Sequence, residues 1–121
     1  MSSAWLIRNF IDGRAKFIFD DDPARHPVAV PFDMFQAKGF GHKGDDCTFE
    51  TLCKEFSILD RRIRTIAEII HDADLDDEKF GRSEGLGLDR ILIGWANNGV
   101  SDEELLRRDM ELIEGLYASV P

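Results

Sequence analysis

The stretch TFETLCKEFSILDRRIRTIAEII, residues 48–70, decides the fold class that the sequence predicts. Its apolar residues recur at spacings of three and four, which is the period of one face of an α-helix. The spacing predicts a helix over 48–56 and a longer helix after it. Their apolar stripes comprise Phe49, Leu52, Cys53 and Phe56 in the first helix, and Leu59, Ile63, Ile66, Ala67 and Ile70 in the second. Two consecutive helices, each with one apolar face, indicate a helical bundle.

Two further helices are predicted on the C-terminal side. A third apolar stripe follows the glycine-rich stretch 81–87 and ends at the turn residues 97–99. The last helix opens at Ser101, which with Glu104 matches a capping box, in which each side chain binds a free backbone amide of the other residue. The residues expected to face inward are Leu88, Ile91, Leu92 and Trp95 in the third helix, and Leu105, Leu106, Ile113, Leu116 and Tyr117 in the fourth.

The N-terminal residues predict one short helix. Residues 3–11 carry the apolar pattern, Ser3 is the expected cap, and the Asp-Gly pair that follows is the expected end. Trp5, Leu6 and Phe10 would form the buried face of this helix.

Two short strands are predicted between this helix and residue 48. Residues 15–19 are rich in β-forming side chains, and residues 27–30 form an apolar run that a proline ends. The expected fold is therefore mostly α, in the α+β class. It is a single domain over residues 1–121, built as a helical bundle with a small two-stranded β element near the N-terminus.

The composition is that of a soluble globular protein, with 43% hydrophobic and 32% charged residues. No run of apolar residues is long enough to span a membrane, and no signal-peptide pattern begins the chain, so we expect a cytoplasmic protein without membrane association. Two cysteines are too few for a disulfide framework. The net charge of −9 repels a phosphate backbone, so we expect no nucleic acid bound by this domain alone, and it suits a cation.

The loop FGHKGDDCTFE, residues 40–50, brings an imidazole, a thiol and carboxylates to the start of a helix. His42 and Glu50 are candidate metal ligands. Cys47 lies where free helical amides would lower the pKa of its thiol and favour the thiolate. The alternative is that this stretch is only a capped helix preceded by a surface loop.

A second polar cluster, HDADLDDE, covers residues 71–78. Asp74 continues the apolar stripe of the preceding helix, and His71 lies on its flank, whereas the other aspartates are expected in solvent. A carboxylate that faces a core must be paired, hydrogen-bonded or metal-bound. The alternative is that the helix ends near Ala73 and that the acidic run is an exposed loop.

If the two clusters meet, His42, Glu50, His71 and Asp74 form a metal site with nitrogen and oxygen ligands. Such a site suits zinc, iron, manganese or nickel. No catalytic residue can be assigned from the sequence.

Arg8 and Cys47 are expected beside these ligands or facing a bound oxyanion. Arg8 has a second interpretation, an ion pair with Asp12 one helical turn away.

Four motifs together resemble one known family. They are residues 5–12 (WLIRNFID), 31–34 (PFDM), 40–50 (FGHKGDDCTFE) and 69–77 (IIHDADLDD). In this order they resemble the C-terminal domain of ChrB-type chromate resistance proteins, from about residue 3 to Tyr117. The resemblance implies a role in bacterial chromate resistance, where such proteins accompany a chromate efflux pump and regulate its expression in response to chromate. In other architectures the domain accompanies a rhodanese-like sulfurtransferase module.

The sequence differs from the family pattern at its start, where MSSA stands in place of a DRIA-like segment before the tryptophan. The N-terminal domain of many family members, a natural place for DNA contact, is not expected here. The leading hypothesis is a domain that binds or senses a metal ion or a small oxyanion as part of a stress-response regulator. The alternatives are a metal-dependent hydrolytic or redox enzyme acting on a small molecule, with Glu50 as acid and base, and an oligomerisation module such as a homodimer.

Overall fold

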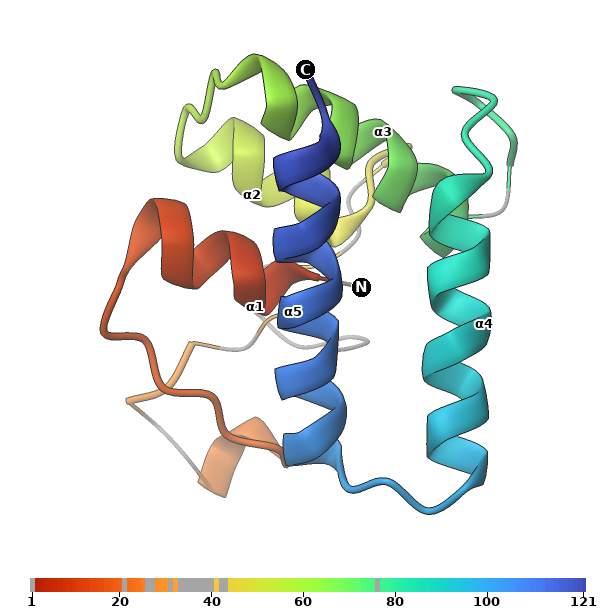
Figure 1. Cartoon of the computed structure of the whole chain (residues 1–121). Coiled ribbons are helices and arrows are strands. Elements are labelled where there is room, and N and C mark those ends of the chain that lie inside the picture. The colour runs from red at the N-terminus through yellow and green to blue at the C-terminus, as the bar shows by residue number, and fades with distance from the viewer. Residues whose placement is uncertain are drawn as a thin grey trace.

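A computed structural model describes residues 2–20, 22–25, 28–30, 32, 41, 44–75 and 77–121 of the chain. Helices dominate this part of the molecule (Figure 1). In chain order they are α1 (Ser3–Leu6), the π-helical turn η1 (Ile7–Ile11), the 3-10 turn η2 (Pro23–Arg25), α2 (Thr48–Glu55), α3 (Arg61–Leu75), α4 (Glu84–Asn97) and α5 (Asp102–Ser119). The mostly helical fold is therefore confirmed.

The predicted two-stranded β element is not found among the described residues. Residues 15–19 and 28–30 belong to neither a helix nor a sheet. In the first segment Phe17 packs its ring against Phe32, with 5.8 Å between ring centroids, while Ile18 and Phe19 are exposed. High β propensity reflects packing on a pleated, half-buried surface, and neither segment has such a surface within the described ranges.

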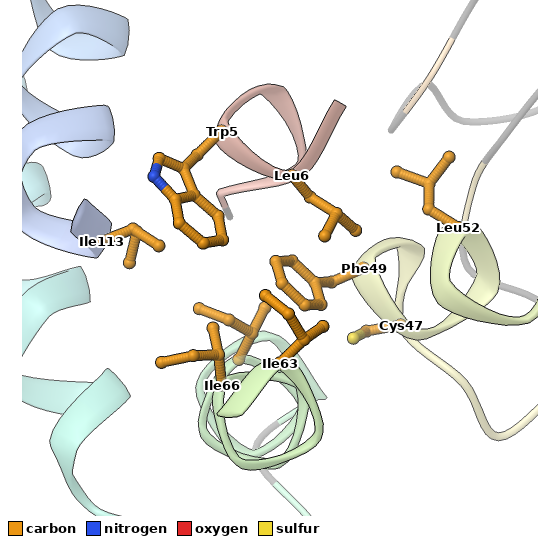
Figure 2. Close-up of a cluster of buried hydrophobic side chains, with 9 residues drawn as sticks. Trp5, Leu6, Cys47, Phe49, Leu52, Ile63, Ile66 and Ile113 are labelled. Carbon is orange, nitrogen blue, oxygen red and sulfur yellow. The ribbon is translucent and has the colours of Figure 1, made fainter. Parts of the chain in front are cut away.

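The hydrophobic core lies where α1, α2, α3 and α5 converge, and Figure 2 shows their side chains pointing toward one another. α3 crosses behind α5, and α4 runs antiparallel to α5 on one side of the molecule (Figure 1). The buried members of the core are Trp5, Leu6, Cys47, Phe49, Leu52, Ile63, Ile66, Ile70 and Ile113. These residues include most of the apolar stripes predicted for α2 and α3, but Phe56 and Leu59 are exposed because they lie in the connection between the two helices.

The predicted N-terminal helix is confirmed as α1 continued by η1, but its details differ. Ser2, with a φ of 68°, occupies the position before the helix, so Ser3 does not cap it. The Ser3 hydroxyl is instead buried and has no hydrogen-bond partner among the described residues. Phe10 is 36% exposed and contacts the rings of Trp5 and Tyr117 at the edge of the core.

Asp60 ties the start of α3 to the end of α5. Its Oδ1 accepts hydrogen bonds from the amides of Arg62 (2.8 Å) and Ile63 (3.2 Å), and its Oδ2 accepts one from the hydroxyl of Tyr117 (2.9 Å). The carboxylate satisfies two of the free amides that every helix leaves at its N-terminus, so one residue begins a helix and anchors another.

The capping box predicted at α5 is half formed. The Ser101 hydroxyl accepts a hydrogen bond from the Glu104 amide at 3.2 Å. The Glu104 carboxylate instead binds the guanidinium groups of Arg107 and Arg108, one turn along the helix.

α4 begins earlier than predicted, so that Gly85 and Gly87 lie inside it. Gly85 is buried because α4 approaches α3 closely there: a Cβ atom on Gly85 would lie 2.6 Å from the Ile69 carbonyl oxygen and 2.8 Å from the Ala73 Cβ. The glycine therefore sets the contact between the two helices. Within the described ranges, none of the helices combines the length and hydrophobicity that crossing a membrane requires.

Replacing Gly85 by alanine should lower the free energy of unfolding by about 1–3 kcal/mol, because the new methyl group meets backbone that cannot move aside. Gly94 is the matched control, since it lies in the same helix and a Cβ atom there would meet no described atom within 4 Å beyond its own helix backbone. Gly94→Ala should raise the free energy of unfolding by about 0.5–1 kcal/mol through helix propensity. Urea denaturation of both variants tests the close contact, and equal effects would contradict it.

Candidate metal centre

His71, on α3, is the centre of the polar site. Its side chain is completely buried, and its ring packs edge-on against Phe80 with 5.1 Å between centroids. The Nδ1 atom contacts Oε1 of Glu50, and the Nε2 atom lies 2.9 Å and 3.1 Å from the two carboxylate oxygens of Asp77. Both ring nitrogens of a buried imidazole thus face carboxylates.

The start of α2 presents Cys47 and Glu50 to this imidazole. Cys47 is the N-cap residue, and Glu50 occupies the third helical position, as in a capping box. Glu50 Oε1 accepts a hydrogen bond from the Cys47 amide at 3.0 Å, and the Thr51 hydroxyl donates to the Cys47 carbonyl at 3.1 Å. The cap therefore fixes a thiol and a carboxylate beside His71.

The other two carboxylates come from the end of α3, which carries Asp72, and from the connection to α4, which carries Asp77. Asp77 also accepts a hydrogen bond from the Lys79 amide at 3.1 Å, which shapes the turn. Asp72, buried on α3, accepts hydrogen bonds from the amides of Phe80 (3.1 Å) and Arg82 (2.7 Å). Backbone amides that would otherwise lack partners are thereby satisfied, and the connection is held against α3.

Within the part of the chain that the structure describes, two groups of side chains have the spacing of metal ligands. Cys47, Glu50 and His71 each offer one donor atom, all within 4.8 Å of one another, and His71, Asp72 and Asp77 form a second such group. The first group combines sulfur, oxygen and nitrogen, whereas the second has two oxygens and one nitrogen.

The two carboxylates raise the pKa of His71. Burial alone would lower that pKa, but hydrogen bonds and charge attraction from Glu50 and Asp77 outweigh it, so the pKa lies above its usual 6.5. In the folded chain without metal, the two carboxylates therefore favour the imidazolium ion over the neutral ring.

The thiolate predicted at Cys47 is not favoured in the metal-free chain. Burial raises the pKa of the Cys47 thiol to about 12, and although the hydrogen bond from the Glu50 amide lowers it, the charges of Glu50 and Asp74 add to the rise. The helical amides are thus outweighed by desolvation and by nearby carboxylates.

Of the four predicted ligands, the structure brings together one from each cluster. Glu50 and His71 are in contact, so the two sequence clusters do meet. Asp74 is half-buried and belongs to neither donor group. His42 lies outside the described residues, so its place as a ligand stays a prediction.

The side-chain contacts of Arg8 among the described residues are with Ala15, Phe17 and Met110, none of which belongs to the two donor groups. Its guanidinium donates to the Ala15 carbonyl at 3.0 Å and stacks 4.9 Å above the Phe17 ring. Among the ion pairs of the described residues, none joins Arg8 to Asp12, whose carboxylate accepts a hydrogen bond from the Arg14 amide.

Two site residues were missed, because Asp72 and Asp77 were expected in solvent. Asp72 is buried, and Asp77 binds His71 although its side chain is 45% exposed. A signal for Asp72 was present: Ile69 is also buried, which widens the apolar stripe of α3 so that the position three residues later faces inward. The position of Asp77 depends on how the chain turns after the helix, which periodicity does not encode.

Comparisons with known proteins give one consistent family. A family model described as the C-terminal domain of ChrB matches residues 1–120. Protein ChrB of Cupriavidus metallidurans (strain CH34) is 31% identical over 119 residues, which cover 97% of this chain and 36% of that protein. The chain thus spans about a third of the length of this curated relative. No solved structure matches it significantly.

Removing the Asp77 carboxylate should destabilise the metal-free chain more at low pH than at high pH. Because the folded-state pKa of His71 is raised, its protonated ring stabilises the fold fully below pH 6.5, and this contribution is lost as the pH rises through the folded-state value. Asp77→Asn weakens that contribution. Its loss of stability relative to the unaltered chain should be larger at about pH 6 than at about pH 9.

Urea unfolding in the presence of a chelator measures this difference. Asp102→Asn, an exposed position in the first turn of α5, removes the same charge far from His71 in the sequence. It should show no comparable pH dependence. Equal losses for Asp77→Asn at both pH values would contradict the imidazolium.

Proposed function

The chain belongs to the ChrB C-terminal domain family, and we propose that it is a metal-binding domain that serves chromate resistance as the sensing part of a regulator. The observation that carries the proposal is the group of Cys47, Glu50 and His71, whose donor atoms lie within 4.8 Å of one another. Cys47 and His71 are fully buried, and the Glu50 side chain is 13% exposed. The connection to chromate follows from the family resemblance, and the metal from the geometry.

The charges around His71 favour a cation over an oxyanion. Three carboxylates, those of Glu50, Asp72 and Asp77, lie around the imidazole. The nearby arginine of the α3–α4 connection, Arg82, is already paired with Glu68 at 2.9 Å. A dianion such as chromate would be repelled from this position, and a divalent cation would be attracted. Chromate would therefore act through the metal or at a position away from His71.

The proposed ligands are the Nδ1 atom of His71, the Glu50 carboxylate and the Cys47 thiolate. Asp77 would then accept a hydrogen bond from the Nε2–H group of the same ring. A ligand histidine that donates its second N–H to a carboxylate is the usual arrangement at protein metal sites, because it orients the ring and makes it a better donor. Coordination also removes the proton from a thiol, whatever its pKa in the metal-free chain.

The donor types favour zinc among the candidate metals. Thiolate and imidazole ligands suit zinc, imidazole also suits iron and nickel, and manganese prefers sites made only of oxygen. The group of His71, Asp72 and Asp77 is the weaker candidate, because the Asp72 oxygens already accept two backbone amides.

Two conservative substitutions should abolish metal binding without disturbing the helix cap. Serine is a preferred N-cap residue and glutamine can replace glutamate in a capping box, so Cys47→Ser and Glu50→Gln should both fold. Each should weaken zinc binding more than about 100-fold, since losing an outer hydrogen-bond partner of a ligand already costs about 10- to 100-fold. Competition titration of the chelator-treated chain with zinc measures the affinity.

Cys53→Ser is the matched control, because Cys53 lies in the same helix but in neither donor group. It should leave the zinc affinity unchanged. At cobalt concentrations high enough to load each variant, a sulfur-to-metal charge-transfer band should appear in the unaltered chain and in Glu50→Gln but not in Cys47→Ser. A chain that binds none of zinc, iron, nickel or manganese would refute the proposal.

A further inference from the structure

We propose that cation binding tightens residues 77–83, the connection between α3 and α4 that we call the 77–83 loop, onto α3. This inference rests on the proposed function, because it concerns the same histidine. It adds a structural consequence: a cation bound on the α2 side of His71 restrains the 77–83 loop on the other side of the ring.

The 77–83 loop is attached to α3 at two places. At its start, Asp77 binds Nε2 of His71, and the Phe80 ring packs against the same imidazole. Further on, the amides of Phe80 and Arg82 donate to Asp72, and the Arg82 side chain binds a glutamate of α3. The first attachment depends on whether His71 carries a proton or a metal. The second attachment does not involve the proposed metal ligands.

The backbone of the loop needs these attachments. Glu78 has a φ of 55° and Gly81 a φ of 64°. The left-handed conformation is uncommon for a residue with a side chain and persists only where neighbouring contacts impose it. Glu78 directly follows Asp77, and its carbonyl accepts a hydrogen bond from the Gly81 amide at 3.3 Å, so the bond from Asp77 to His71 is one of the contacts that hold it.

A cation on Nδ1 would strengthen that bond. The metal–ligand bond fixes the orientation of the imidazole, and the ring is left with a single N–H group, which points at Asp77. A neutral metal-free ring can carry its one proton on either nitrogen, whereas a metal on Nδ1 confines that proton to Nε2, where it binds Asp77. The carboxylate and the loop that carries it are therefore held more firmly when the site is loaded.

The effect extends to α4, because the 77–83 loop leads into its first turn. Gly85 packs directly against Ile69 and Ala73 of α3. α4 also carries Leu86, Ile91 and Ile93 as exposed apolar side chains. Cation binding would thus restrain the first turn of α4, which packs against α3.

Hydrogen exchange of individual backbone amides, followed by nuclear magnetic resonance, tests the inference. The amides of Phe80 and Arg82 are the probes, and the Glu104 amide, which caps α5, is the internal reference. Saturating zinc should slow exchange of the two probes by at least about tenfold and leave the reference unchanged.

Asp77→Asn should reduce that slowing to less than about twofold at saturating zinc, because the link between ring and loop is weakened. Glu78→Gln is the control, since it removes a charge from the next residue of the same loop without touching His71, and it should keep the full effect. Zinc binding without any change at Phe80 and Arg82, or the same slowing in Asp77→Asn, would overturn this inference alone. Absence of zinc binding would overturn the proposed function with it.

Discussion

A fully buried imidazole must find partners for both of its ring nitrogens, and His71 meets this constraint by joining three parts of the chain. Glu50 reaches it from the first turn of α2, Asp77 from the segment after α3, and Phe80 covers its face. Leaving either nitrogen unpaired would carry the cost of a desolvated polar group. The positions of the α2 N-terminus and of the α3–α4 connection therefore follow from the hydrogen bonds that the two ring nitrogens of His71 require.

Periodicity predicted the elements of the fold better than it predicted their ends and contacts. The stripes of 48–70 correctly placed α2 and α3, because a helix that buries one face must repeat its apolar residues. The strand predicted for residues 15–19 was wrong, because high β propensity reflects side-chain packing on a half-buried sheet surface more than a preference of the backbone. Gly85 was placed before the third helix, yet it lies inside α4, at a position where only glycine fits against the Ile69 carbonyl.

The sequence predicted the site residues whose position depends on a nearby helix. It did not predict the residue whose position depends on how the chain turns after a helix ends. Glu50 follows from a capping pattern, and its contact with His71 was anticipated from two polar clusters. Asp77 was assigned to solvent because no periodic rule says where a chain turns after its helix ends. Burial also reversed the expected ionisation of Cys47, since its desolvation outweighs the helical amides. Family membership adds the biological setting, and the surrounding carboxylates favour a cation within it.

The double role that we propose for Cys47, as helix cap and as metal ligand, has an evolutionary consequence. Serine, threonine, aspartate or asparagine would begin α2 at least as well as a thiol, because each is a favoured capping residue. A chain under selection for stability alone would drift toward one of them. Conversely, a lineage that gave up its metal could exchange cysteine for serine in one step without losing the helix. The residue at this position in each homologue would thus record whether that lineage kept the sulfur donor.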